Sequence, residues 1–301
     1  MKRGRFVVAL TAVVLLTTLT PAAGQDAVKA EIRQAIDAAY LNAYWNGMDI
    51  KAFLAGWDHG AISPTLRPTG EVTHIAVTEW IAGAVRANRK PPEKKEFTFL
   101  YPVIDVTGGM AMAKVEVMRG QTLAFTYYFP VVKARAGWKI VGYPYYQHRN
   151  GARPEAAAGE ADAVKKVVED TLVRGLLQDG TKEQVLAGMG PFCDIHLYLP
   201  EVDLVTKQDL TPVFATKAYV KSRADRGDPR PPIKTSAFTL IGMTGDVAAG
   251  KLAVTFDRGT VMTMYVVLYK LKTGWAIVQI TTDRPLGSMF AAAPPAPKHA
   301  Q

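Results

Sequence analysis

The chain has 301 residues, of which 49% are hydrophobic and 21% are charged, with a formal net charge of +9 and a single cysteine. Such a mild basic excess argues against a nucleic-acid-binding protein, which would gather its Lys and Arg on one face. A single cysteine excludes an intramolecular disulfide, so each folded unit must be stable through its hydrophobic core.

Residues 1–24 have the pattern of a secretory signal peptide. A basic start at 2–5 precedes an apolar stretch over 6–19, and small residues end the segment at Gly24. The apolar stretch is shorter than the ~20 residues that a membrane-spanning helix needs. We therefore expect cleavage after Gly24, no stable membrane insertion afterwards, and a periplasmic or secreted protein whose net charge falls from +9 to +6 as three basic residues are lost.

The second half of the sequence repeats the first. Two glycine-containing motifs recur 137 residues later: Thr107-Gly108 as Thr244-Gly245, and Gly137-Trp138 as Gly274-Trp275. A period this long matches a whole domain rather than a solenoid repeat. We predict four segments after the signal peptide: a first domain over 25–149, a linker over 150–160, a second domain over 161–286 and a disordered Ala- and Pro-rich tail over 287–301.

The predicted elements follow the same order in both halves. Apolar residues three and four apart predict a helix over 28–44 and another over 163–177. Each half then continues with a short helix, a strand and a third helix: 50–57, 61–66 and 80–85 first, then 182–189, 192–199 and 214–220.

Four β-rich runs separated by glycine-containing turns end each half and predict an antiparallel meander. The sequence therefore predicts an α+β protein with two tandem domains. Each domain would pack three helices on one face of a curved antiparallel sheet.

This order, with Asn46-Gly47 closing the first helix and Gly137-Trp138-Lys139-Ile140-Val141 as a final strand, resembles the nuclear-transport-factor-2-like superfamily. Within it, the closing strand is most similar to the bacterial group named "putative lumazine-binding" proteins. The resemblance covers 27–149 and 161–284. It implies a cone-shaped sheet that wraps a pocket in each copy.

The superfamily includes ketosteroid isomerases and polyketide cyclases, in which a tyrosine of helix one and an aspartate of the first strand carry out proton transfer. The resemblance places Tyr40 at the tyrosine but about Thr65 at the aspartate, and Val173 and about Leu199 in the second copy. Since proton transfer needs a titratable group at the reacting carbon, we predict no catalytic residue.

One enzymatic alternative keeps Tyr40 as a hydrogen-bond donor beside a different acid. Glu116, Asp105 and His59 are the candidates for that acid. This alternative requires at least one of the three side chains to enter the pocket.

Aromatic residues are denser in the first half than in the second. Tyr and Trp combine apolar area with one hydrogen-bonding group, which suits a flat, partly polar ligand. We predict that Tyr40, Trp57, Trp80 and Tyr127 line a pocket for a small hydrophobic or aromatic ligand. No Gly-rich phosphate loop or nucleophile elbow is found, so no cofactor is predicted.

Asp194 and His196 lie two residues apart on a predicted strand and so share a face with Tyr198. A metal site would need a third ligand close by, and the sequence offers no His or Cys cluster for it. We expect a solvated strand face here, without a metal. Cys193 is expected to be a small buried residue.

The strands over 123–132 and 261–271 are apolar on both faces, whereas a sheet covered on one side alternates polar and apolar residues. We therefore expect the second face to be covered as well. The two copies would pack sheet against sheet within the chain as a pseudo-dimer, or a homodimer would form through the same faces.

Two basic bends, over 86–95 and 221–234, follow the predicted third helices. Cations at a helix end complement its dipole, although they could also bind an acidic partner or lipid head groups. The leading hypothesis is an exported, non-catalytic small-molecule-binding protein with an aromatic pocket in the first domain. The alternatives are an isomerase- or cyclase-like enzyme and a protein-interaction module of the cell envelope.

Overall fold

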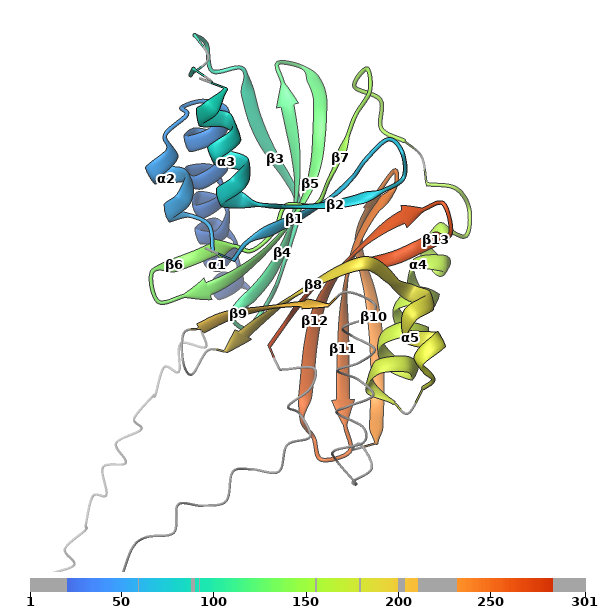
Figure 1. The fold of residues 1–301 in the computed structure, drawn as a ribbon. Coiled ribbons are helices and arrows are strands. Elements are labelled where there is room, and N and C mark those ends of the chain that lie inside the picture. Colours follow the sequence, from blue (N-terminus) through green and yellow to red (C-terminus); the bar gives the residue numbers. More distant parts are fainter. Residues whose placement is uncertain are drawn as a thin grey trace, which may run out of the picture.

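The computed structural model describes residues 21–58, 60–87, 90–91, 93–154, 156–178, 180–199, 204–210 and 232–283. Most of the predicted signal peptide, His59, the predicted helix over 214–220 and the predicted tail lie outside these residues. The described elements form an α+β structure in which each half builds one large sheet with helices against it (Figure 1).

The first half begins with a long helix whose winding changes along its length. Helix α1 (Pro21–Ile36) continues into a π-helical segment, η1 (Asp37–Trp45), which buries Tyr40 and Tyr44. Two shorter helices follow, α2 (Ile50–Ala55) and α3 (Val77–Arg86). The side chain of Asp49 accepts a hydrogen bond from Ala52 N at 3.0 Å and so caps α2.

The strands of the first half form a two-stranded and a larger antiparallel sheet. The small sheet contains β1 (Ile62–Leu66) and β2 (Val72–Ala76). The larger one has the order β3 (Phe97–Thr107), β4 (Met110–Arg119), β5 (Thr122–Ala134) and β6 (Gly137–Ile140), with β7 (Tyr145–Gln147) also paired to β5. The meander was predicted, whereas β2 and β7 were not.

The second half repeats the helix start and the meander. Its helices are α4 (Glu160–Val168), the π-helical η2 (Glu169–Leu177) and α5 (Lys182–Gly188). Its six-stranded sheet has the order β10 (Ile233–Thr244), β11 (Val247–Phe256), β12 (Val261–Leu271), β13 (Gly274–Thr282), β8 (Met189–Leu199) and β9 (Leu204–Leu210).

The prediction of a purely antiparallel sheet is wrong for this second half. Strand β13 pairs with β8 in parallel, with Ile280 beside Ile195. The meander leaves β13 with an open edge, and β8 satisfies the backbone groups of that edge. In the first half the corresponding approach is a single parallel bridge between Trp57 and Ile140.

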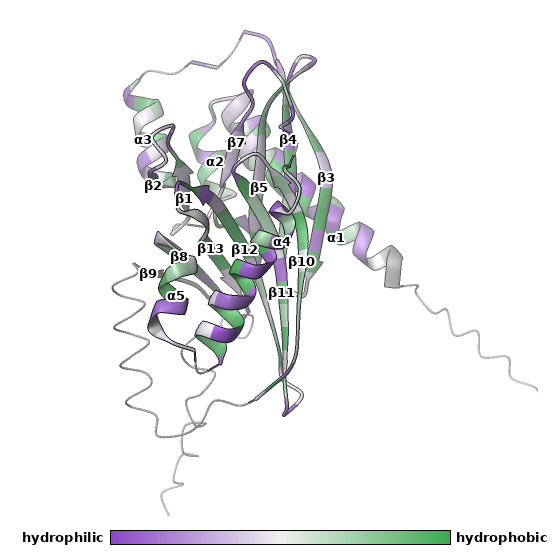
Figure 2. Cartoon of the chain, turned by 90° about the vertical axis from the view of Figure 1, so that its right-hand side faces the viewer, coloured by the Kyte–Doolittle hydropathy of each residue, from purple (hydrophilic) through white to green (hydrophobic). Residues whose placement is uncertain are grey.

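The two large sheets pack against each other, with their helices on the outer sides (Figure 1). Along β5, Tyr127 and Phe129 join the core beneath the first-half helices, whereas the alternate residues Tyr128 and Val132 join a core shared by both halves. Along β12, Tyr265 alternates with Met264 in the same way. This shared core explains the apolar character of both faces, visible as continuous hydrophobic strands in Figure 2.

Polar contacts also join the halves. Lys251 Nζ lies 2.7 Å from Asp105 Oδ1, and Tyr265 Oη donates to the same oxygen at 2.6 Å. Tyr128 Oη and Thr244 Oγ1 are 3.1 Å apart. The interface therefore combines an apolar centre with hydrogen-bonded side chains.

The strand face of Asp194 and His196 was predicted to be solvated, and this prediction is wrong. Asp194 is 3% exposed and His196 is fully buried, because the face packs against the first half. His74 Nδ1 of β2 donates to Asp194 Oδ2 at 2.8 Å. Cys193, on the opposite face, is buried as predicted, and burial raises the pKa of its thiol, which makes it unreactive.

Candidate functional site

The core of the first half is dominated by aromatic rings gathered around Tyr40. We call the following set the aromatic cluster: Tyr40, Tyr44, Trp45, Phe53, Trp57, Trp80, Phe99, Tyr127, Phe129 and Tyr143. Each of the other nine rings has its centroid within 6.4 Å of the Tyr40 ring centroid. Aromatic pairs at this spacing attract beyond their buried area.

The helices and the sheet each contribute one side of the cluster. In η1, Tyr40 and Tyr44 stack with their ring planes 3° apart. Trp57 follows the end of α2, and Trp80 of α3 lies over Tyr44 with ring centroids 4.1 Å apart. Strand β5 supplies Tyr127 and closes the cluster from the sheet.

The four residues predicted to line a pocket all belong to this cluster. Tyr40, Trp57 and Tyr127 are between 1% and 3% exposed, and Trp80 is half-buried. Three cavities of the described chain, of about 740, 700 and 470 Å³, are lined by other residues. The four side chains thus pack against one another, and their contact with a ligand stays a prediction.

A hydrogen bond between two tyrosines lies at the centre of the cluster. Tyr40 Oη donates to Tyr127 Oη at 3.0 Å, far from solvent. Burial raises the pKa of both phenols well above the ordinary value of 10.0. Both hydroxyls therefore stay protonated at neutral pH and can act as hydrogen-bond donors but not as bases.

Two buried polar atoms beside these rings have no partner among the described residues. They are the indole Nε1 of Trp57 and the side-chain Oδ1 of Asn46. An unpaired buried donor or acceptor is costly and therefore uncommon in a folded protein. The first half thus offers one hydrogen-bond donor and one acceptor within apolar, aromatic surroundings.

Half-buried rings form a rim at one end of the cluster. Trp45 lies against Phe97 and Phe125, with centroid distances of 4.5 and 5.5 Å, and Tyr145 lies 5.2 Å from Tyr127. The sequence reasoning included Trp45, Phe125 and Tyr145 among the aromatic residues without assigning them a place. The alternation of Phe97, Phe99 and Tyr101 with exposed residues along β3 was the signal that could have located this wall.

The acids of the enzymatic alternative lie elsewhere. Glu116 and Asp105 occupy the opposite face of the sheet from the cluster. Glu116 pairs with Arg153 at 2.6 Å, and Asp105 pairs with Lys251 of the second half. Both were considered as the acid beside Tyr40, and the strand alternation excludes them. His59 lies outside the described residues.

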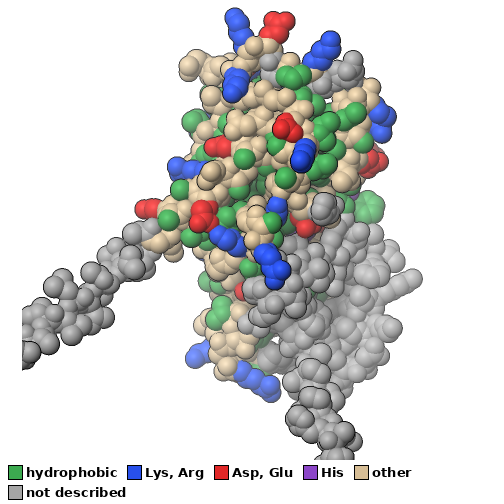
Figure 3. All heavy atoms as spheres, turned by 90° about the vertical axis from the view of Figure 1, so that its left-hand side faces the viewer, with side chains coloured by type: hydrophobic (Ala, Val, Ile, Leu, Met, Phe, Trp, Pro, Cys, Tyr) green, Lys and Arg blue, Asp and Glu red, His purple; other side chains and the backbone are tan. Residues whose placement is uncertain are grey.

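The first basic bend carries charges of both signs. Arg86, Lys90, Lys94 and Lys95 are exposed, with Glu93 and Glu96 among them. Charged side chains also stand at the upper end of the helical side in Figure 3, above exposed hydrophobic side chains. Of the basic residues of the second bend, the described chain includes only Lys234.

Searches for two other kinds of site gave no candidate in the described residues. They contain no group of three or more His, Cys, Asp or Glu side chains suited to a metal ion. None of the helices in the ranges given above is long and apolar enough to cross a membrane.

Comparison with known proteins matches the first half to a family. Residues 28–146 match the model of the family described as "Putative lumazine-binding". No curated protein matches the sequence. The family match thus covers the half that contains the aromatic cluster.

Solved structures similar to this chain include three NTF2-like proteins of unknown function. The protein from Shewanella baltica OS155 is 17% identical, with a TM-score of 0.34, 43% of this chain covered and 98% of that chain. The protein from Silicibacter pomeroyi DSS-3 is 20% identical, with a TM-score of 0.34 and coverages of 43% and 100%. The protein from Methylobacillus flagellatus KT is 16% identical, with a TM-score of 0.33 and coverages of 44% and 98%.

Proposed function

We propose that this protein is a non-catalytic binding protein for a flat, partly polar aromatic molecule, held by the aromatic cluster of the first half. The observation that carries the proposal is the unpaired, buried indole N–H of Trp57 within that cluster. An apolar aromatic site with a few polar groups is the usual composition of a small-molecule pocket. The protonated phenols and the distant acids argue against proton-transfer chemistry.

A fused heterocycle with carbonyl oxygens fits these groups. Its ring faces would stack on the half-buried rim rings, and a carbonyl oxygen would accept the hydrogen bond from Trp57. The pteridine class, to which lumazine belongs, has both features. The description of the family matched by residues 28–146 supports the same class.

The chain organisation forms part of the proposal. We assign two tandem domains to 25–149 and 161–286, joined by the linker 150–160, with the second domain mainly a packing partner for the first. The shared core between the two sheets supports this pseudo-dimer within one chain. The pattern of residues 1–24 supports export, which cell fractionation and the mass of the exported chain would test.

Binding can be tested with lumazine and riboflavin as probes. We expect each bound probe to raise the melting temperature, because a ligand that binds only the folded state stabilises it. Trp57→Phe should weaken binding about tenfold, since the ring remains but the donor is lost. Trp275→Phe, in the second half, is the matched control.

Two results would overturn the proposal. One is the absence of any shift with both probes at millimolar concentration. The other is an equal loss of affinity in Trp57→Phe and Trp275→Phe, which would show that the effect does not arise at the cluster.

A further inference from the structure

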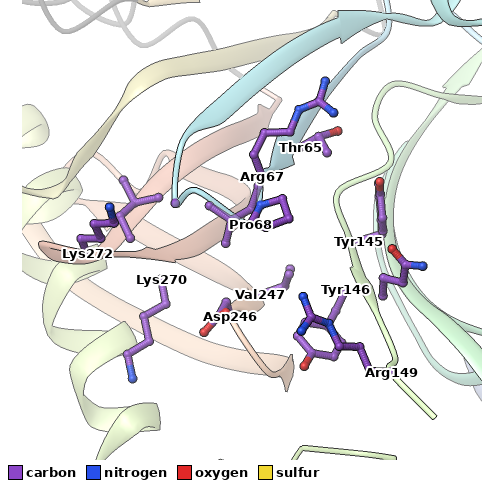
Figure 4. Close-up of a pocket in the computed structure, with 14 residues that line it drawn as sticks. Thr65, Arg67, Pro68, Tyr145, Tyr146, Arg149, Asp246, Val247, Lys270 and Lys272 are labelled. Atoms are coloured by element: carbon purple, nitrogen blue, oxygen red, sulfur yellow. The ribbon is translucent and has the colours of Figure 1, made fainter. Parts of the chain in front are cut away.

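A cleft of about 740 Å³ opens where the two halves meet (Figure 4). The first half lines it with the turn between β1 and β2 and with residues 145–149. The second half contributes the β10–β11 and β12–β13 turns. The cleft is therefore formed by both halves together, and neither half contains it alone.

Contacts between the halves fix the walls relative to each other. Tyr269 Oη donates to the carbonyl of Pro64 at 2.8 Å and accepts from Tyr145 N at 3.2 Å, so one buried tyrosine ties the second half to two wall segments of the first. A polar group buried with both bonds made holds its neighbours in one arrangement.

Two glycines allow the turns to approach so closely. Gly245 has a φ of +54°, and a Cβ there would lie 2.1 Å from the ring of Tyr146. Gly70 has a φ of +85°, and the aliphatic part of Lys272 lies against it. Only glycine combines this backbone conformation with the space that these side chains need.

The cleft has an excess of positive charge. Arg67, Arg149 and Lys272 have no carboxylate within ion-pairing distance among the described residues. Lys270 also lines the cleft, but Glu160 pairs with it at 2.5 Å. Asp246 is the one acidic residue of the lining. The unpaired cations come from three separate segments, so a single carboxylate cannot reach them all.

Tyr145 and Tyr146 add half-buried aromatic rings to the same lining. In Figure 4, Tyr146 and Arg149 lie on one side of the cleft, Lys270 and Lys272 on the other, and Arg67 between them along the wall. We propose that this cleft binds a small aromatic polyanion, with two or more carboxylates paired to Arg67, Arg149 and Lys272 and its ring against the tyrosines. Arg–carboxylate pairs and aromatic contacts both favour such a ligand.

Benzene-1,3,5-tricarboxylate is a suitable probe, and cyclohexane-1,3,5-tricarboxylate is its non-aromatic counterpart. Calorimetry on the full protein at low salt should show binding of the aromatic probe, with affinity falling as salt rises. Arg149→Gln and Lys272→Gln should each weaken binding about tenfold, because each removes a charge-assisted hydrogen bond. Lys51→Gln makes the same charge change on α2, outside the cleft lining, and should leave affinity unchanged.

Three outcomes would overturn the proposal: no binding of the aromatic probe, equal weakening by Lys51→Gln, or equal affinity for the cyclohexane compound, which would remove the aromatic part of the assignment. The melting temperature of each variant checks that it is folded. Trp57→Phe should retain tricarboxylate binding, so a failure at the cleft is distinguishable from a failure at the aromatic cluster.

Discussion

Trp138 Nε1 donates a hydrogen bond to Glu31 Oε2 at 3.3 Å, and this relationship recurs between Trp275 and Glu160 in the second half. In each half a lysine completes the group, Lys133 at 2.6 Å from Glu31 and Lys270 at 2.5 Å from Glu160. We call each set of three a helix clasp, because it joins the first helix of its half to the hairpin that precedes the last strand of the meander. The repeated Gly-Trp motif is therefore a structural feature.

The helix clasp predicts a specific pattern of stability. Trp138→Phe keeps the ring but removes the donor, so we expect a lower urea midpoint. With Glu31→Gln already present, the same substitution should cost less, because both changes affect one interaction. Full additivity of the two effects would contradict the clasp. The cycle of Trp275→Phe and Glu160→Gln should behave in the same way.

Acid should weaken both clasps. Hydrogen bonds from Lys133 and then Trp138 lower the pKa of Glu31 below its ordinary 4.5, and Lys270 and Trp275 lower that of Glu160. Because each folded-state pKa is depressed, the stabilisation is present above pH 4.5 and is lost as the pH falls through the folded-state value. Urea unfolding at pH 3 and pH 6 should show a smaller pH effect in the Glu31→Gln and Glu160→Gln double variant.

The sequence predicted the helix clasp only in part. The Gly-Trp motifs lie 137 residues apart, but Glu31 and Glu160 are 129 residues apart, since the segments between helix and meander differ in length. A constant spacing therefore finds the tryptophans and misses their partner. The alternation along β5 and β12 was informative because strand geometry directly sets which side chains share a face.

Features that depend on contacts between distant segments were not predictable. The short strands β2 and β7 gain stability from pairing rather than from their own residues. Asp194 and His196 look like a solvated face, yet His74, 120 positions away from Asp194, covers them. The cationic cleft likewise combines turns from both halves, each of which alone has the composition of an exposed turn.

The Tyr40–Tyr127 hydrogen bond should show a marked asymmetry between single and double variants. Tyr40→Phe leaves the buried Tyr127 hydroxyl without a partner, and this should cost about 1–3 kcal/mol of unfolding free energy. Replacing both tyrosines by Phe should cost less than the sum of the two single variants, because no polar atom is then left unpaired. Chemical denaturation of the four proteins measures this coupling, and additive costs would contradict it.

Tyr269 should contribute strongly to the association of the two halves. Tyr269→Phe removes the donor to Pro64 O and the acceptor for Tyr145 N, both at buried positions, so we expect a loss of about 1–3 kcal/mol. Tyr101→Phe is a suitable control, because the Tyr101 hydroxyl bonds to Asp37 within the first half and is partly exposed. An unfolding free energy of Tyr269→Phe equal to that of the control would contradict this role.

His148 should make stability depend on pH near neutrality. Its Nδ1 donates to the carbonyl of Ala152 at 2.7 Å and its Nε2 accepts from Thr126 Oγ1 at 2.8 Å, which is the neutral ring. Burial lowers the pKa of His148 below its ordinary 6.5. The unfolded chain therefore takes up a proton first as the pH falls, so the contribution of this ring to stability is full above pH 6.5 and declines from there down to the folded-state pKa. Urea midpoints between pH 5 and 8 should show this decline, and His148→Gln should reduce it; an unchanged slope in that variant would show that the pH dependence arises elsewhere.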